Sequence, residues 1–143
     1  MIQLYEDISP FLADILNGTI NYGQIVQRAR PLYDEIEEQK ETARQKLLEK
    51  LESVMKLVVK FTWLSQDEIR SKCNRREISD AKKLFCYHAK NEYKSLSSSA
   101  IGEYIYDYPI QTSHHDKVIY NIKRMEEVPE LVLMYEEFKA EQI

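Results

Sequence analysis

The side chains best suited to chemistry lie between residues 113 and 124, where hydrogen-bond donors and an aromatic ring recur at helical spacing. Counted from Ser113, the next members follow after four, three and four residues. On an α-helix this spacing places them on one face. Lysine can reach guanine acceptors in the DNA major groove, asparagine can pair with adenine, and arginine can hold a phosphate. The stripe therefore predicts a recognition helix with Ser113, Lys117, Tyr120, Asn121 and Arg124 outward and with Val118, Ile119, Ile122 and Met125 inward.

A second group of candidate residues is basic and precedes this stripe. The whole chain is acidic, with 24 Asp and Glu against 20 Lys and Arg, which argues against indiscriminate binding of polyanions. Between residues 70 and 94, however, only Glu77, Asp80 and Glu92 are acidic. The segment is locally basic and suited to contact phosphates through Arg70, Lys72, Arg75, Arg76, Lys82, Lys83, Lys90 and Lys94.

Other reactive residue types do not form a recognisable catalytic or metal site. Cys86 and His88 are two apart in a predicted helix and point in different directions, and Cys73 has no partner at zinc-ligand spacing. His114 and His115 are adjacent at a helix start, without a nucleophile motif. We therefore expect no enzyme, no cofactor and no metal, and we interpret His88 as a core or rim histidine.

The elements that would position these residues are predicted to be helices, because three Gly and four Pro are too few for an all-β fold. Residues 5–30 predict two short helices, broken around Asn17 and Gly18 and bounded by Pro31. From there a run rich in Glu, Lys, Gln, Leu and Ala predicts one long helix, about residues 32–64. Its apolar residues form two series: Ile36, Ala43, Leu57 and Leu64, and Leu47, Val54 and Phe61.

These series leave two interpretations of the long helix open. Spacing by seven favours a homodimer through this helix, whereas Lys40 and Lys50 interrupt the pattern. Residues 54–64 are apolar almost all round, which favours packing in the core of the same chain.

The second half predicts shorter helices with recognisable ends. After a polar hinge at residues 65–68, an apolar stripe predicts a helix over 76–93, and the serines at 95–99 predict a turn that caps a short helix ending by Pro109. Thr112 or Ser113 caps the recognition helix to about Glu127, and a last amphipathic helix follows Pro129. For the connector tyrosines Tyr104, Tyr106 and Tyr108, packing against neighbouring helices is favoured over a stacking platform for bases.

Several of these residues occur in an order found in a known family. The order runs through Ser71–Lys72, Arg75–Arg76, Ala89–Lys90, a turn at Leu96, Ile101–Gly102 and a helix led by His115 that ends in Lys123–Arg124–Met125. Residues 69–125 thereby resemble the C-terminal DNA-binding domain of the bacterial replication initiator DnaA. The resemblance implies a helix-turn-helix domain over residues 67–143, carried on a helical platform over residues 1–66.

The resemblance also implies residue roles. Arg75 or Arg76 would enter the minor groove, Lys82 and Lys83 would contact phosphates, and bases would be read by His115, Asp116 and Lys117. The family's Gly-Gly-Arg-Asp-His-Thr-Thr signature is altered here, since a longer connector over residues 106–113 replaces its glycines, and Asp116 and Lys117 replace its threonines. We therefore expect DNA binding of this geometry, but not at the family's own target sequence.

The initiator's ATP-binding motor is not expected in this chain. Gly18 and Gly23 have the spacing of two phosphate-loop glycines, but Gln24 and Ile25 stand where Lys and Ser or Thr are required. No apolar run is long enough to span a membrane, and the N-terminus lacks the basic region of a signal peptide, which predicts a cytoplasmic location.

The sequence thus predicts an all-α protein that binds double-stranded DNA as a regulator or replication-associated factor of phage or mobile-element type. The alternative is a protein-interaction module on a helix-turn-helix scaffold that no longer binds DNA. That alternative is favoured by the net acidity, by Asp116 in the reading helix, by the Glu-rich C-terminal segment and by the ten tyrosines.

Overall fold

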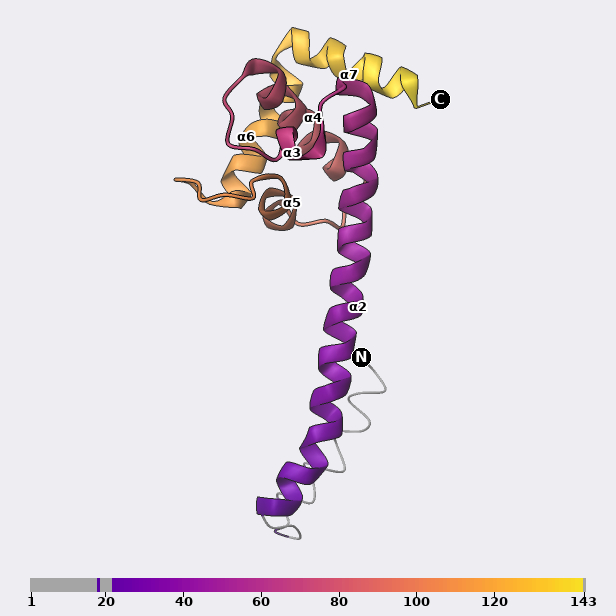
Figure 1. Ribbon diagram of the computed structural model, residues 1–143, viewed down its shortest axis with the longest axis vertical. Helices are drawn as coiled ribbons and strands as arrows, with labels where there is room; N and C mark the ends of the chain where they lie inside the picture. Colours follow the sequence, from indigo (N-terminus) through magenta and orange to yellow (C-terminus); the bar gives the residue numbers. More distant parts are fainter. Residues whose placement is uncertain (1–17, 19–21, 143) are drawn as a thin grey trace. The chain divides into compact units, whose positions relative to one another are not determined.

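The computed structural model describes Gly18 and residues 22–142, which are all-α and contain no strand (Figure 1). The elements are α2 (Tyr22–Thr62), α3 (Gln66–Ile69), α4 (Arg76–Glu92), α5 (Ser98–Ile105), α6 (His114–Glu127) and α7 (Pro129–Glu141). The predicted fold class, with one long helix followed by shorter ones, is confirmed. Among residues 22–142, the helices contain no apolar stretch of the length that a membrane span requires.

The chain divides into two compact units, Met1–Lys46 and Leu47–Ile143. This division differs from the expected boundary between residues 66 and 67, because the end of α2 belongs to the core of the second unit. Leu51, Val54, Met55 and Val58 are all buried there. Of the two interpretations of the long helix, packing within the chain therefore holds for this end of α2.

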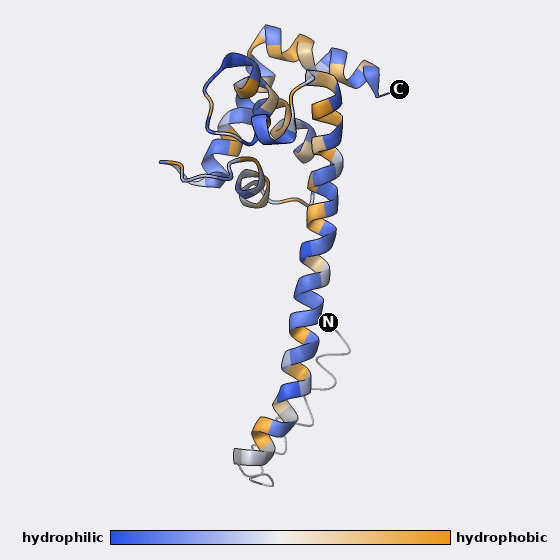
Figure 2. Cartoon of the chain, in the orientation of Figure 1, coloured by the Kyte–Doolittle hydropathy of each residue, from blue (hydrophilic) through white to orange (hydrophobic). Residues whose placement is uncertain are grey.

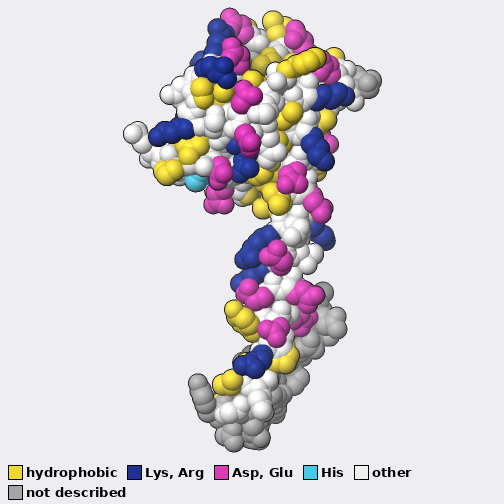
Figure 3. All heavy atoms as spheres, in the orientation of Figure 1, with side chains coloured by type: hydrophobic (Ala, Val, Ile, Leu, Met, Phe, Trp, Pro, Cys, Tyr) yellow, Lys and Arg dark blue, Asp and Glu magenta, His cyan; other side chains and the backbone are white. Residues whose placement is uncertain are grey.

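In the first unit, the described part of α2 is mainly hydrophilic (Figure 2). Acidic and basic side chains are mixed along it (Figure 3), with ion pairs at i,i+3 spacing of 3.7 Å for Glu37 and Lys40 and 3.3 Å for Glu41 and Arg44. Exposed pairs of this kind each support an isolated helix by only about 0.2–0.5 kcal/mol.

Pro31 does not bound a helix, contrary to the expectation from sequence, but lies inside α2. A proline removes one helix hydrogen bond and crowds the preceding turn. Good helix formers such as Ala29 and Leu32 flank it, and the helix continues through it. The short helices expected before residue 22 lie outside the described residues, apart from Gly18, whose φ of +68° is the left-handed conformation expected of a helix C-cap.

The second unit forms around one apolar core to which all the helices from α2 to α7 contribute. α7 lies across the C-terminal end of α2 (Figure 1), where the rings of Phe61 and Phe138 meet edge to face with centroids 5.4 Å apart. Phe85 of α4 stacks on Tyr104 of α5 at 5.5 Å. Every buried side-chain nitrogen and oxygen of the described residues has a hydrogen-bond partner.

The helix starts in this unit follow from local capping. Ser97 and Ser113 accept hydrogen bonds from the backbone N–H groups of Ala100 and Asp116, and Pro129 occupies the first turn of α7. These three starts, and the extent of α4, confirm the sequence predictions. The polar hinge at residues 65–68 was a wrong interpretation, because Ser65 and Glu68 form a capping box that begins α3.

Trp63 follows the last residue of α2 with a φ of 64°, a conformation that L side chains rarely adopt. Its N–H donates to Val59 O at 3.0 Å and thereby closes the helix end, as a glycine often does. The indole is 92% exposed.

Gly102 sets the approach of α5 to the start of α6. A Cβ added there would lie 2.7 Å from His114 Cβ and 2.8 Å from His114 O, which is closer than real Cβ atoms come. The two helices can pack at this distance only because residue 102 has no side chain.

Candidate nucleic-acid interface

α6 presents most of the predicted reading residues to solvent. Ser113, the N-cap, is exposed, as are His115, Asp116, Tyr120 and Arg124, while Lys117 is half-buried. Val118 and Met125 are buried and fix which face of the helix points inward. Ile119 was expected inward but is 45% exposed, because its position falls between the inward and outward faces.

Asn121 was expected to contact DNA, and the structure corrects this. Its side chain is 3% exposed and donates to Tyr106 Oη at 2.7 Å and to Cys86 Sγ at 3.6 Å. It lies three residues after Val118 and four before Met125, so it shares their inward face, and Tyr106 satisfies its amide.

Lys82 was expected to contact phosphate, and it too is buried, with 4% of its surface exposed. Its Nζ donates to Ser71 O and, at 2.9 Å, to Tyr108 Oη. The ammonium also lies 5.2 Å from the ring centroid of Tyr106 and 4.9 Å from that of Tyr108. Burial lowers the pKa of Lys82. These contacts occupy the amine, so it is a structural residue and not a phosphate contact.

Lys83 is half-buried, and its Nζ donates to Ser79 Oγ at 2.7 Å. Its pKa is lowered by burial and, against the attraction of Asp80, by repulsion from Arg124 and Lys117. Lys117 and Arg124 of α6 thus both lie near Lys83 of α4. We call Lys83, Lys117 and Arg124 the α4–α6 basic cluster.

None of the three makes an ion pair with a carboxylate of the described residues. Lys117 instead has two aromatic neighbours: its Nζ lies 5.6 Å from the ring centroid of Tyr120 and 5.9 Å from that of Tyr106.

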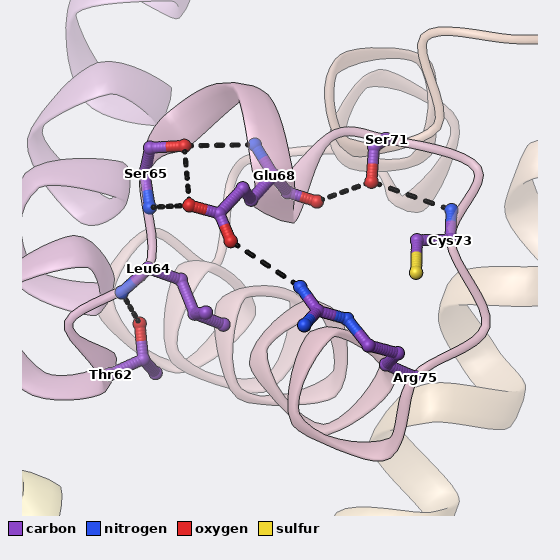
Figure 4. A network of polar contacts seen from close by, with 7 residues as sticks. All are labelled: Thr62, Leu64, Ser65, Glu68, Ser71, Cys73 and Arg75. Atoms are coloured by element: carbon purple, nitrogen blue, oxygen red, sulfur yellow. Dashed lines mark hydrogen bonds and ion pairs between the residues drawn. The ribbon is translucent and has the colours of Figure 1, made fainter.

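The two arginines expected at the minor groove lie where the loop between α3 and α4 ends: Arg75 is the N-cap of α4 and Arg76 is its first residue. Figure 4 shows how the start of this loop is fixed: Ser71 Oγ donates to Glu68 O at 2.6 Å and accepts from Cys73 N at 3.4 Å. In the same view Arg75 reaches Glu68 at 3.5 Å. Arg76 pairs with Glu130 and lies 3.8 Å from Asp80. Exposed pairs of this kind are weak, about 0–1 kcal/mol, so a phosphate can replace them.

A groove that sequence reasoning missed runs between this loop and the connector from α5 to α6. We call it the connector groove. Its volume is about 450 Å³, and it is lined by Lys72, Asn74, Tyr106, Tyr108, Pro109, Ile110, Gln111, Thr112 and Lys117. The alternating tyrosines before Pro109 were the sequence signal for it. Packing, the favoured interpretation of these rings, is confirmed: Tyr104 and Tyr106 are buried, and Tyr108 is half-buried against the core.

The histidine and cysteine candidates outside this interface do not form a reactive site in the described residues. His88 is buried against Phe138, which confirms it as a core histidine. Burial raises the pKa of Cys86 to about 12, so this thiol is unreactive, and Cys73 is exposed. Among residues 22–142, no group of three or more His, Cys, Asp or Glu side chains is placed to hold a metal ion.

Comparisons with protein families, with curated proteins and with solved structures find no match for this chain.

Proposed function

We propose that the protein binds double-stranded DNA, with α6 in the major groove. The observation that carries the proposal is the α4–α6 basic cluster, in which Lys117 and Arg124 repel Lys83. Asp80 attracts Lys83, but none of the three cations forms an ion pair with a carboxylate of the described residues. A phosphate backbone would relieve this repulsion and release its own counterions.

The rigid seating of α6 supports the same proposal. Gly102 brings α5 against the start of α6, and Ser113 caps the helix that carries the reading residues. A helix that reads bases must present its N-terminal residues in a fixed register. His115, Asp116 and Lys117 occupy that part of α6, with Tyr120 one turn further on.

The proposed interface is narrower than the sequence suggested. It consists of outward residues of α6 with Lys83, and of Arg75 and Arg76 at the start of α4. Lys82 and Asn121 are excluded from the interface by their burial. The resemblance of residues 69–125 to the initiator's DNA-binding domain agrees with this division between a reading helix and a basic loop. Asp116 would accept from cytosine or stabilise the helix N-terminus.

The test is fluorescence anisotropy of the full chain with a random-sequence duplex and with a duplex carrying the initiator's box, titrated over salt. We expect log K to fall by about 0.9 per phosphate contact per log unit of salt. Arg124→Ala should weaken binding on all sequences and reduce the salt slope by about 1, whereas His115→Ala or Lys117→Ala should change sequence preference.

Lys123→Ala is the matched control, because Lys123 is an exposed lysine of the same helix that pairs with Glu127 at 3.9 Å. It should leave affinity and slope close to those of the unmodified chain. Absence of binding to either duplex at low salt, by a sample with a helical circular dichroism spectrum, would contradict the proposal.

A protein-docking role for the same helix is the second candidate, and the exposure of Ile119 and Tyr120 specifically favours it. Aromatic residues are enriched at protein interfaces. This candidate predicts a stoichiometric protein partner that nuclease treatment does not remove, and Ile119→Asp should abolish its binding.

A further inference from the structure

The connector groove combines features that small-molecule sites share. Its volume of about 450 Å³ lies in the range of such sites, roughly 300–1,000 Å³. Tyr106, Tyr108, Pro109 and Ile110 provide apolar and aromatic surface. Asn74, Gln111 and Thr112 add polar groups that can donate to a ligand.

The charge of the groove is positive although the whole chain is acidic. Lys72 from the loop before α4 and Lys117 from α6 both line it, and no carboxylate does. Both amines are near enough to oppose the burial that raises the pKa of Tyr108. Two cations supplied by different elements around one aromatic residue suit an anion better than a neutral ligand.

Tyr108 is arranged to donate a hydrogen bond to such an anion. Its Oη accepts from Lys82 Nζ at 2.9 Å, so one lone pair is occupied and the phenolic proton remains to be donated. Its ring packs edge to face on Tyr106 with centroids 5.9 Å apart, which holds the hydroxyl in place.

From this arrangement we propose that the connector groove binds a nucleoside phosphate, with the phosphate between Lys72 and Lys117 and the base against the ring of Tyr108 and Pro109. The phosphate can belong to a free mononucleotide or to an unpaired nucleic-acid strand. The inference does not depend on duplex binding by α6, with which it shares only Lys117.

The experiment follows backbone amide shifts of the ¹⁵N-labelled full chain during separate titrations with AMP, adenosine and inorganic phosphate. AMP should shift the amides of Asn74, Gln111 and Thr112 in a saturable way. It should bind more tightly than adenosine or phosphate, because only AMP uses both the lysines and the aromatic surface. A single-stranded oligo(dT) distinguishes the sources: tighter, salt-sensitive binding indicates a strand, and binding no tighter than AMP indicates a free nucleotide.

Two variants test the named contacts. Lys72→Met removes an exposed cation, and Tyr108→Phe removes the hydroxyl but keeps the ring; each should weaken AMP binding about tenfold. The matched control is Lys94→Met, because Lys94 is an exposed lysine that does not line the groove. Thermal unfolding of each variant verifies that it is folded. Because Lys72 is exposed, Lys72→Met should stay folded and still tests the inference if Tyr108→Phe unfolds.

Three results would overturn the inference. The first is no saturable shift up to about 10 mM AMP, at which even a Kd of roughly 1 mM would be seen. The second is AMP affinity unchanged in Lys72→Met, and the third is an oligo-glutamate peptide that shifts the same amides as tightly as AMP, which would assign the groove to acidic proteins. Duplex binding is measured on the same samples. Loss of AMP binding with duplex binding retained would overturn the inference and leave the proposed function intact. AMP binding without duplex binding would contradict the proposed function and leave the inference intact.

Discussion

Lys82 and Asn121 show how single polar residues can be held in the interior of this domain. An unpaired amine or amide in an apolar core is unfavourable by several kcal/mol, so each needs a partner. Tyr108 and Tyr106 supply the partners through their hydroxyl oxygens. The tyrosines of the connector therefore act as polar anchors for α4 and α6 as well as apolar packing.

His88 gives a pH dependence that can be measured. Burial lowers its pKa from the ordinary 6.5, so the folded chain favours the neutral ring. Its stabilising contribution is complete above pH 6.5, and it is lost as the pH falls from there through the lower pKa of the folded state. In urea unfolding at about pH 7.5 and about pH 5.5, the unmodified chain should lose more free energy of unfolding than His88→Gln does.

The control for this prediction is His115→Gln, in which an exposed histidine of α6 is replaced. This variant should keep the pH dependence of the unmodified chain. Equal pH dependence of His88→Gln and the unmodified chain would show that His88 does not couple to folding.

For single residues, spacing along the chain predicted which side chains of α6 point outward, but not the hydrogen-bond partners of the buried polar ones. Lys117 and Arg124 follow from helical periodicity alone. The burial of Lys82 depends on Tyr108, and that of Asn121 on Tyr106, both of which are brought close only by the folded connector. A single sequence contains no local signal for such a pair, since Lys and Asn are exposed in most helices.

At the scale of elements, Gly102 determines how α5 and α6 meet. Gly102→Ala would normally stabilise a helix by roughly 1 kcal/mol, but here the new Cβ meets the backbone oxygen of His114 at 2.8 Å. The backbone of His114 can move away only by disturbing the start of α6, and overpacking of this kind destabilises a protein by about 1–3 kcal/mol. We therefore expect Gly102→Ala to lower the free energy of unfolding by about 1 kcal/mol or more, measured by urea denaturation.

Glu103→Ala is the neighbouring control, since Glu103 is exposed on the same helix. It should change stability by less than about 0.5 kcal/mol. A Gly102→Ala variant as stable as this control would mean that α5 and α6 are not in close contact.

Helix starts could be predicted where the sequence has a capping residue or a first-turn proline, as at Ser97, Ser113 and Pro129. The helix boundary predicted at Pro31 was wrong, because the sequence does not distinguish a proline at a helix start from one inside a helix. The sequence indicates a hinge where Ser65 and Glu68 form a capping box, because α3 is only four residues long and has no apolar repeat. Short helices are therefore the elements that periodicity cannot reveal.

On the scale of the whole molecule, the core lies within the second unit. Every buried apolar residue of the described chain falls between Leu51 and Phe138. A fragment of residues 47–143 should therefore unfold in one cooperative transition, with the urea midpoint of the full chain. Circular dichroism at increasing urea measures this. A broad transition, or a clearly lower midpoint, would show that residues 1–46 stabilise the core.

Trp63 is the single tryptophan of the chain and stands 92% exposed after α2. Its indole is surrounded by water in the folded protein and remains so when the protein unfolds. Intrinsic tryptophan emission will therefore be red-shifted from the outset and will barely follow denaturation, so backbone signals are needed to monitor folding. The same property makes this residue a built-in optical reporter, because a blue shift on adding a ligand or partner would mean that the junction of α2 and α3 has been covered.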